Sequence, residues 1–458
     1  MQQLQAVLQS MRAFFDSGTM SPYAFRKKQL LNLKEAVLKY TNEISTALYS
    51  DMKKSPEEAY ATETGLLIAE LNTSLENLHS WMKPKSASTN LVNLPSSSKI
   101  YRDPLGVVLI IAPWNYPLQL SLIPLVGAIC GGNCAVVKPS ELAPATAAII
   151  EKILIETFPP AYVRVIQGDG ADLIPAMMKA FRFDHVFYTG SIPVGKSIYQ
   201  MAAADLIPVT LELGGKSPVI IENDANLEVA ARRVALGKYT NAGQTCIAPD
   251  YVLVHKDVKE KFISYLKKSI SKFYTNDASS SYDYGKIINT RRFDKLISYL
   301  DQGKLLYGGQ HNRDTLFIAP SIMDEVLLDS PLMKEEIFGP ILPVFGYDSF
   351  DEAFSIVQQN PNPLAFYLFT NNSQVEKKWI RKLHFGSGCI NNSVWQFGNH
   401  NLPFGGVGNS GMGAYHGKFS FETFTHAKSV MKTPVWFDPS IKYPSFKGKL
   451  RLFKNLFR

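Results

Sequence analysis

The sequence has few cysteines, little charge and no long uninterrupted apolar segment. Four cysteines among 458 residues exclude a disulfide scaffold and indicate a reducing compartment. The first twenty residues lack a basic start followed by a continuous apolar run, so we expect no secretory signal. One uncharged stretch, residues 104–137, is interrupted by Pro113, Pro117 and Pro124, whereas a spanning helix needs about 20 successive apolar residues. We therefore expect a soluble, cytoplasmic protein.

The excess of basic residues is concentrated at one end of the chain. Lys plus Arg is 48 and Asp plus Glu is 40, which gives a net charge of +8. Residues 441–458 hold six basic side chains and no acid, so the rest of the chain carries only +2. The body therefore lacks the basic surface that nucleic-acid binding requires, and we expect no nucleic-acid partner.

Residues 441–458 form a basic tail with an amphipathic pattern. Leu452, Phe453, Leu456 and Phe457 recur at the spacing of one helical face. Such a face fits peripheral contact with an anionic membrane, packing against a partner subunit, or a solvated terminus. Eighteen residues with six charges are too few and too polar to span a bilayer. The sequence leaves the three interpretations open.

Apolar residues recur at helical spacing through most of residues 1–82. Two stretches carry the pattern, namely Leu30, Leu33, Ala36, Val37 and Tyr40, and Leu66, Leu67, Glu70, Leu71 and Leu75. The Ser-, Pro- and Asn-rich residues 84–98 predict an extended connector.

From Gly106 onward, short β-branched runs alternate with helical segments, which indicates a parallel sheet covered on both faces. We predict strands at 106–111, 134–138, 162–166, 185–189 and 208–213, with helices at 116–130, 144–158, 171–180 and 193–204. A second series has strands at 218–222, 251–255 and 341–347 and helices at 226–238, 256–273 and 290–301. Gly214 and Gly215 separate the two series. The predicted fold class is α/β, with a doubly wound parallel-sheet domain followed by a second α/β domain.

Residues 190–197 match the phosphate-loop pattern G-x-x-x-x-G-K-[ST] between a predicted strand and a predicted helix. Backbone N–H groups at a helix N-terminus suit a phosphate, as in a nucleoside triphosphatase. However, Pro193 removes one donor, and the strands that follow offer only loose candidates for a magnesium-binding acid. The motif alone leaves a nucleoside triphosphatase, another nucleotide-binding fold and coincidence open.

Cys246 differs from the other cysteines in its surroundings. It follows the polar run Asn-Ala-Gly-Gln-Thr, whereas Cys389 lies in an apolar, strand-like run. Cys130 and Cys134 lack a second pair of ligands, so we expect no metal site. A single cysteine is either a small buried hydrophobe or, where its thiolate is favoured, a strong nucleophile.

Glu212 and Asn115 are the other polar candidates. Glu212 stands between two leucines, so it is either a satisfied core carboxylate or a carboxylate with a raised pKa that suits base catalysis. Asn115 follows a predicted strand, where open α/β sheets bind ligands. Its amide is either structural or a donor to an oxyanion.

Seven motifs follow one another along the chain: PWNYP (113–117), KPSE (138–141), TGSIPVGK (189–196), LELGGKSP (211–218), GQTC (243–246), EEIFGP (335–340) and LPFGGVGNSGMG (402–413). Their order and spacing resemble the aldehyde dehydrogenase superfamily over about residues 10–440. NCAVVKPSEL, GQTCIAPDY and GMGAYHGKFSFETFTH are similar to its class 3 branch, which takes fatty and aromatic aldehydes.

The resemblance implies a role for each residue at a matching position. Cys246 would be the nucleophile, Glu212 the general base, and Asn115 an oxyanion donor together with the backbone N–H of Cys246. The implied cofactor-binding residues are Lys138 and Glu141 near the adenosine ribose, Gly190, Ser191 and Gly195 at the pyrophosphate turn, Glu336 and Phe338 on the nicotinamide side, and also Trp114 and Leu213.

The resemblance further implies a homodimer that oxidises an aldehyde to the carboxylic acid with NAD or NADP, through a thiohemiacetal and a thioester on Cys246. The choice of cofactor stays open, because Glu141 would repel a 2′-phosphate and Lys138 would accept one. The alternatives are a CoA-acylating relative and a nucleoside triphosphatase that uses residues 190–197.

The implied domains divide the chain as follows. Residues 1–83 and 103–211 would bind the dinucleotide, and residues 212–396 would carry the nucleophile. Residues 84–102 and 397–440 would bridge or oligomerise through a small β arm, and residues 441–458 would form the basic tail.

Overall fold

The chain begins with helices, as its apolar periodicity predicts, and the computed structural model describes residues 2–457. The helices are α1 (Gln2–Asp16), α2 (Tyr23–Lys39), α3 (Thr41–Met52), α4 (Pro56–Ala59) and α5 (Gly65–Met82), with the π-helical turn η1 (Tyr60–Thr64) joining the last two. Leu30, Leu33 and Val37 are buried on α2, so the predicted face is the one that packs.

A six-stranded sheet forms the centre of the first α/β unit. Its strands are β3 (Val107–Ile111), β4 (Cys134–Lys138), β5 (Val163–Val165), β6 (His185–Gly190), β7 (Val209–Leu213) and β17 (Gly411–Met412), in the order β17-β7-β6-β3-β4-β5. The first five are parallel, and the short β17 pairs antiparallel to β7. All residues of β3 and β4 are buried, which explains their uninterrupted apolar sequences.

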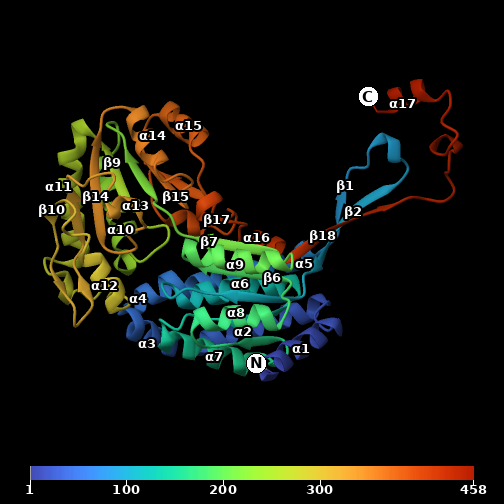
Figure 1. The fold of residues 1–458 in the computed structure, drawn as a ribbon, viewed down its shortest axis with the longest axis horizontal. Helices are drawn as coiled ribbons and strands as arrows, with labels where there is room; N and C mark the ends of the chain where they lie inside the picture. Colours follow the sequence, from blue (N-terminus) through green and yellow to red (C-terminus); the bar gives the residue numbers. More distant parts are fainter. Residues whose placement is uncertain (1, 458) are drawn as a thin grey trace.

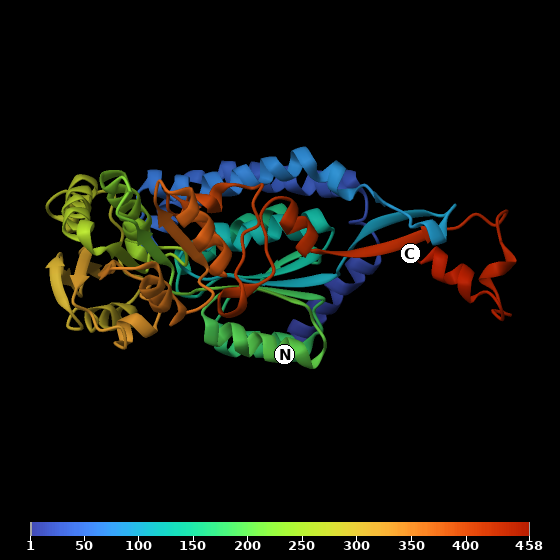
Figure 2. The same cartoon turned by 90° about the horizontal axis from the view of Figure 1, so that it is seen from above.

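Helices cover both faces of this sheet (Figure 2). On one face lie α6 (Pro117–Gly131) and α7 (Pro144–Thr157), with α2 and α5 packed behind α6. On the other face lie α1, α8 (Gly170–Ala180) and α9 (Ile192–Ala204). The doubly wound arrangement predicted from the sequence is confirmed.

A seven-stranded sheet forms the second α/β unit (Figure 1). Its strands are β8 (Pro218–Ile221), β9 (Tyr251–His255), β10 (Lys304–Tyr307), β13 (Ser321–Asp324), β14 (Ile341–Tyr347), β15 (Ala365–Phe369) and β16 (Ser387–Ile390), in the order β10-β13-β14-β9-β8-β15-β16. Only β10, at one edge, runs antiparallel to its neighbour. The small hairpin of β11 (His311–Asn312) and β12 (Phe317–Ile318) lies outside this sheet.

The helices of the second unit include α10 (Leu227–Tyr239), α11 (Lys259–Tyr274), α12 (Thr290–Ile297), α13 (Pro331–Lys334), α14 (Phe350–Gln358) and α15 (Ser373–Lys382). The predicted helix at 290–301 is four residues too long. Beyond Ile297 the N–H groups of Tyr299 and Leu300 bond to the carbonyl three residues back, so the chain turns out of the helix. Trp379 is buried between α14 and β15, where its ring contacts Phe350 and Phe366.

A three-stranded arm projects from the first α/β unit, on the side away from the second unit (Figure 1). It consists of β1 (Lys85–Ala87), β2 (Ser97–Pro104) and β18 (Thr425–Lys432), which follows α16 (Lys418–Thr423). Strand β18 pairs antiparallel to all of β2, from Thr425 opposite Pro104 to Lys432 opposite Ser97. The predicted connector is therefore mostly loop, and the arm joins segments more than 300 residues apart.

The basic tail continues beyond the arm and forms α17 (Leu450–Leu456). Leu452 and Phe457 are exposed, and the Phe453 ring contacts Phe446 at a centroid distance of 5.7 Å. Of the predicted helical face, the side chain of Leu456 lies outside the described residues, as does Arg458. Within the part of the chain that is described, no helix is long and apolar enough to cross a membrane.

Candidate active site

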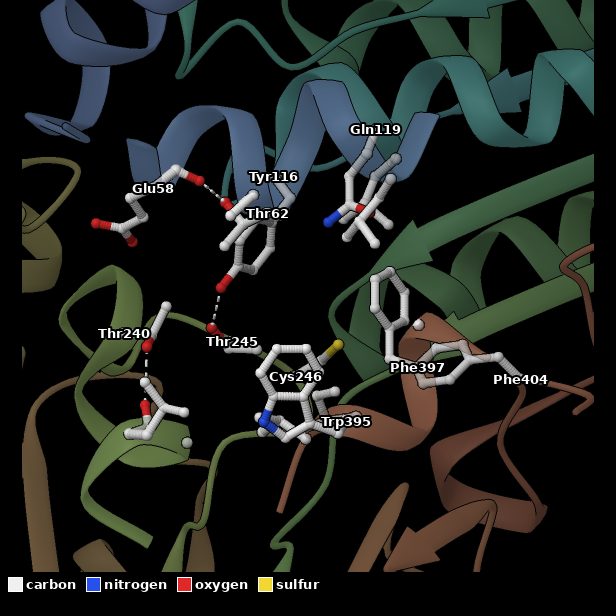
Figure 3. A pocket seen from close by; sticks show the side chains of 18 of the residues that line it. Glu58, Thr62, Tyr116, Gln119, Thr240, Thr245, Cys246, Trp395, Phe397 and Phe404 are labelled. Atoms are coloured by element: carbon white, nitrogen blue, oxygen red, sulfur yellow. Dashed lines mark hydrogen bonds between the residues drawn. The ribbon is translucent and has the colours of Figure 1, made fainter. Parts of the chain in front are cut away.

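Cys246 lies on the loop between α10 and β9, at the wall of a cavity of about 550 Å³. Figure 3 shows Cys246 beside Trp395 and Phe397, with Tyr116 and Thr245 nearby. The apolar lining includes Leu120, Ile247, Phe273, Trp395, Phe397, Phe404 and Tyr415. A partly buried thiol therefore faces a mainly apolar space large enough for a small-molecule substrate.

The surroundings of Cys246 favour the protonated thiol. Burial, together with the nearby carboxyl groups of Glu336 and Glu212, raises its pKa to about 12. Although the sequence around Cys246 is polar, the folded protein without ligands does not stabilise the thiolate. The thiol must lose its proton during the reaction.

Glu212 lies on β7 and lines the same cavity as Cys246. Its side chain is buried, and burial alone raises its pKa well above the usual value for a glutamate. Neither carboxyl oxygen has a hydrogen-bond partner among the described residues. The carboxyl group of Glu212 is therefore not a satisfied core group but is free to bond a water or substrate molecule.

Asn115 lies between β3 and α6, at the carboxyl edge of the six-stranded sheet. Its side-chain Nδ2 donates a hydrogen bond of 3.1 Å to the carbonyl oxygen of Gln244, two residues before Cys246. The main-chain carbonyl oxygen of Asn115 accepts hydrogen bonds from Lys54 Nζ at 3.0 Å and from Asn241 Nδ2 at 2.9 Å. The amide is thus fixed beside the cysteine loop.

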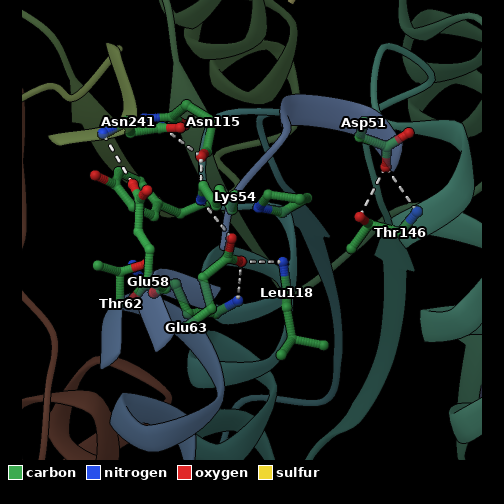
Figure 4. A network of polar contacts seen from close by, with 12 residues as sticks. Asp51, Lys54, Glu58, Thr62, Glu63, Asn115, Leu118, Thr146 and Asn241 are labelled. Carbon is green, nitrogen blue, oxygen red and sulfur yellow. Dashed lines mark hydrogen bonds and ion pairs between the residues drawn. The ribbon is translucent and has the colours of Figure 1, made fainter. Parts of the chain in front are cut away.

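A buried ion pair supports this turn from the N-terminal helices (Figure 4). Lys54 Nζ lies 2.6 Å from Glu63 Oε1, and both side chains are fully buried. Glu63 Oε2 accepts the N–H of Leu118 at 2.8 Å, in the first turn of α6, while Lys54 lies 4.0 Å from the Tyr116 ring centroid. The hydroxyl groups of Tyr116 and Thr245 lie 2.7 Å apart, which links the turn to the residue before Cys246.

The cysteine loop begins with two residues in a left-handed conformation. Asn241 and Ala242 have φ angles of 54° and 51°, which non-glycine residues rarely adopt. The carboxylate of Glu58, on α4, accepts the Asn241 N–H at 2.9 Å, and the Asn241 side chain donates to Asn115 and Gln244. Glu58 and Asn115 therefore hold the turn that presents Cys246.

The predicted adenosine-side and pyrophosphate residues lie at one edge of the six-stranded sheet. Lys138 ends β4 and forms an ion pair with Glu141, whose Oε1 accepts the Gly170 N–H at 3.5 Å. Gly190 ends β6, and Ser191 is the N-terminal cap of α9, whose first N–H groups receive no capping hydrogen bond from the Ser191 side chain. Lys138, Glu141, Gly190 and Ser191 are not among the residues that line the Cys246 cavity, whereas Leu213 is.

Gly195 permits close packing at this edge. A Cβ at Gly195 would lie 2.6 Å from Leu213 Cδ2, so a larger residue would displace the Leu213 side chain, which lines the Cys246 cavity. The carboxyl ends of parallel strands meet at the same edge, which brings these residues together although they are far apart in sequence.

Glu336 and Phe338 belong to the second unit and lie close to Gly214 and Trp114, respectively. Phe338 contacts the Trp114 ring edge-on at 5.3 Å, and a Cβ at Gly214 would lie 2.0 Å from Glu336 Oε2. Burial, together with the nearby Asp250, raises the pKa of Glu336 to about 8. Its Oε1 has no hydrogen-bond partner within residues 2–457.

Several supporting residues were not predicted from the sequence. Glu58, Lys54 and Glu63 belong to the N-terminal helical segment and carry no local motif. Lys216 and Asp250 form a second buried pair at 2.5 Å, and Asp250 Oδ1 accepts the Ile337 N–H at 3.0 Å, next to Glu336. Lys54, Glu58 and Glu63 stand among other charged residues in 51–64, so the sequence does not distinguish them from solvent-exposed charges.

Comparison with known proteins identifies the family of the chain. The sequence pattern of the aldehyde dehydrogenase family matches residues 1–430. The chain is 45% identical over 449 residues to the 4,4'-diaponeurosporen-aldehyde dehydrogenase of Staphylococcus aureus, which covers 98% of this chain and 97% of that protein. It is 40% identical over 452 residues to the dimeric NADP-preferring aldehyde dehydrogenase of Canis lupus familiaris, with 98% and 99% covered.

A solved structure shows the same fold. The substrate-bound Staphylococcus aureus AldH has a TM-score of 0.96 and 44% sequence identity, over 99% of each chain. The family resemblance inferred from the seven motifs is confirmed over nearly the whole sequence. The chain belongs to the aldehyde dehydrogenase family and is an oxidoreductase that acts on aldehydes.

Proposed function

We propose that this protein oxidises an apolar aldehyde, aliphatic with a medium or long chain or aromatic, to the carboxylic acid through a thioester on Cys246. The observation that carries the proposal is that Cys246 and the unpartnered Glu212 line one mainly apolar cavity. The Staphylococcus aureus relative is named for a diaponeurosporen-aldehyde, which supports an apolar substrate.

The Cys246 thiol first gives up its proton to water in the cavity. The resulting thiolate Sγ then adds to the carbonyl carbon, and the C=O π electrons move to the carbonyl oxygen, which becomes an oxyanion. The Asn115 amide, held beside the loop, and the Cys246 backbone N–H are the donors for that oxygen. Loss of one such donor typically lowers the rate by about 10²–10³.

The residues at the sheet edge fit a dinucleotide. The free N–H groups of α9 suit a pyrophosphate, the paired Lys138 and Glu141 suit ribose hydroxyls, and the orphaned Glu336 Oε1 needs a donor from a ligand. NAD or NADP, when bound, supplies the hydride acceptor that the oxidation requires. The canine relative is named for a preference for NADP.

Glu212 completes the reaction. As a base it takes a proton from a water molecule, which then attacks the thioester carbon and releases the carboxylic acid and the Cys246 thiol. The buried carboxyl group with a raised pKa is a stronger base than an exposed glutamate once it is deprotonated.

We also infer a homodimer that is held by the arm. Strand β18 is exposed from His426 onward, and the segment after it presents Val435 at 97% and Trp436 at 77% exposure. An exposed strand and exposed apolar side chains beside it both favour association with a second copy. The canine relative is named dimeric.

The test is Cys246→Ala, assayed with decanal and with benzaldehyde, each with NAD and with NADP. The wild type should reduce the nucleotide, and the variant should lose this activity but still bind nucleotide, because the thiol serves the chemistry and not the fold. Normal turnover of the variant would refute the assignment. A requirement for CoA would replace hydrolysis by acyl transfer, and Mg²⁺-dependent ATP hydrolysis without aldehyde oxidation would point to residues 190–197.

A further inference from the structure

One continuous stretch, residues 394–417, supplies an aromatic wall of the cavity. It contributes Trp395, Phe397, Phe404 and Tyr415 to the lining, and we call it the wall segment. Apart from short 3₁₀ turns and the two-residue β17, it has no regular secondary structure. Its position must therefore be fixed by side-chain contacts.

Glu70 on α5 provides one set of contacts that hold the wall segment. Its side chain is fully buried, and Oε1 accepts the Gly417 N–H at 2.7 Å. Oε2 accepts a hydrogen bond from His400 Nδ1 at 3.0 Å and lies 3.5 Å from His416 Nδ1. One carboxylate thus joins an N-terminal helix to three residues of the wall segment.

His416 connects Glu70 to the aromatic side chains that line the cavity. It is 2% exposed and has a φ of 78°, a conformation that costs energy in a residue with a side chain. Its ring stacks on Tyr415 at 4.2 Å and meets the edges of Phe397 at 4.9 Å and Phe404 at 5.8 Å. The ring beside Glu70 therefore touches three of the four aromatic side chains of the wall.

Glu70 is ionised at neutral pH. Burial acts to raise its pKa, but the hydrogen bonds from His400 and the Gly417 N–H, together with the nearby His416 ring, outweigh burial and lower the pKa to about 2. A buried negative charge with several donors is a rigid anchor, because each donor lost leaves the charge less compensated.

We propose that Glu70, with His400 and His416, positions the aromatic wall and thereby determines the affinity for long apolar aldehydes. The proposal rests on the proposed function. None of the three residues is among those that line the cavity, so each acts as a positioning residue and not as a catalytic one. A short aldehyde at Cys246 contacts less of the wall segment than a long one does, so its KM should be much less sensitive to the loss of Glu70 or His400.

The test compares KM and kcat for decanal and propanal in Glu70→Gln and His400→Ala. We expect KM for decanal to rise about threefold to tenfold, as for loss of a hydrogen bond to a charged group, while KM for propanal and both kcat values stay within about twofold. His400→Asn retains a donor near the position of Nδ1 and should recover most of the decanal affinity. The matched control is Glu76→Gln on the exposed face of α5, which should change neither KM.

A second readout does not depend on turnover. Decanoic acid should bind more weakly to Cys246→Ala/Glu70→Gln than to Cys246→Ala, as measured by calorimetry. Equal affinities, or equal losses for decanal and propanal, would overturn the inference. A wild type without aldehyde oxidation would instead refute the proposed function.

The metal content must also be measured, because ligand atoms of Glu70, His400 and His416 all lie within 4.8 Å of one another. We expect the purified protein to contain no stoichiometric metal and EDTA to leave KM for decanal unchanged. One equivalent of zinc that is lost in Glu70→Gln would overturn the hydrogen-bonded unit, because a metal ion would then hold the wall.

Discussion

Replacement of Lys54 by Met should destabilise the protein more than joint replacement of Lys54 and Glu63. The two groups form a fully buried ion pair with a separation of 2.6 Å. Lys54→Met leaves the Glu63 carboxylate buried without its cation, whereas Lys54→Met/Glu63→Gln leaves two neutral groups. The amide oxygen of Gln can still accept the Leu118 N–H that Glu63 accepts now.

The expected magnitudes differ clearly. Breaking a buried pair by removal of one partner costs about 3–5 kcal/mol, whereas neutral replacement of both partners often costs much less, and we expect about 1–2 kcal/mol here. Burial already raises the pKa of Glu63 in the presence of Lys54. Without Lys54 the carboxyl group takes up a proton more readily, so the cost of the single variant should increase as the pH rises through the raised pKa.

The assay is denaturant unfolding followed by circular dichroism at a fixed protein concentration, at pH 6 and pH 8. Lys304→Met is the control, because Lys304 and Glu325 form an exposed pair at 2.9 Å and should contribute less than about 1 kcal/mol. A single variant as stable as the double variant, or no dependence on pH, would refute this reasoning. Both Lys54 variants should also show a lower kcat, because the Asn115 carbonyl oxygen loses a donor.

Three further outcomes are expected. Glu212→Gln should accumulate an acyl adduct visible by intact mass, and in the wild type deacylation should accelerate with pH as Glu212 loses its proton; no adduct in a fully active variant would exclude Glu212 as the base. Alkylation of Cys246 by iodoacetamide, mapped by peptide mass, should rise about tenfold per pH unit up to pH 10, whereas a plateau near pH 8 would contradict a pKa of about 12. Glu141→Gln removes a charge that disfavours a 2′-phosphate and frees Lys138, so kcat/KM for NADP relative to NAD should rise about tenfold, and an unchanged ratio would place the 2′-position elsewhere.

Regular elements with a strong local pattern were predictable from the sequence. The β-branched runs of β3, β4 and β6 are buried on both faces of a parallel sheet, and such strands are apolar along their whole length. Their pattern therefore identified both the strands and the helices between them. The edge strand β10 was not predicted, and the arm was expected only from the family resemblance, since pairing between distant segments such as β2 and β18 leaves no periodicity in either one.

The motif residues Cys246 and Glu212 could be predicted as candidate site residues, but their pKa values could not. The resemblance placed Cys246 and Glu212 in one site, and the structure brings them to one cavity. The pKa of each group depends on the packing of both sheets around it, because burial is the largest cause of both shifts. No sequence pattern specifies that packing.

Glu70 shows how a sequence can indicate a buried charged group that holds a loop in place. Glu70 stands among Leu66, Leu67, Leu71 and Leu75 on what periodicity predicts to be a core face, and it is fully buried there. A buried carboxylate needs several donors, and the irregular backbone of loops has free N–H groups that need acceptors. Glu58, Glu63 and Glu70 each accept a backbone N–H from a loop or a helix start beside the cavity. The N-terminal helical segment therefore belongs to the candidate active site, because it supplies acceptors for backbone N–H groups at three places around the cavity.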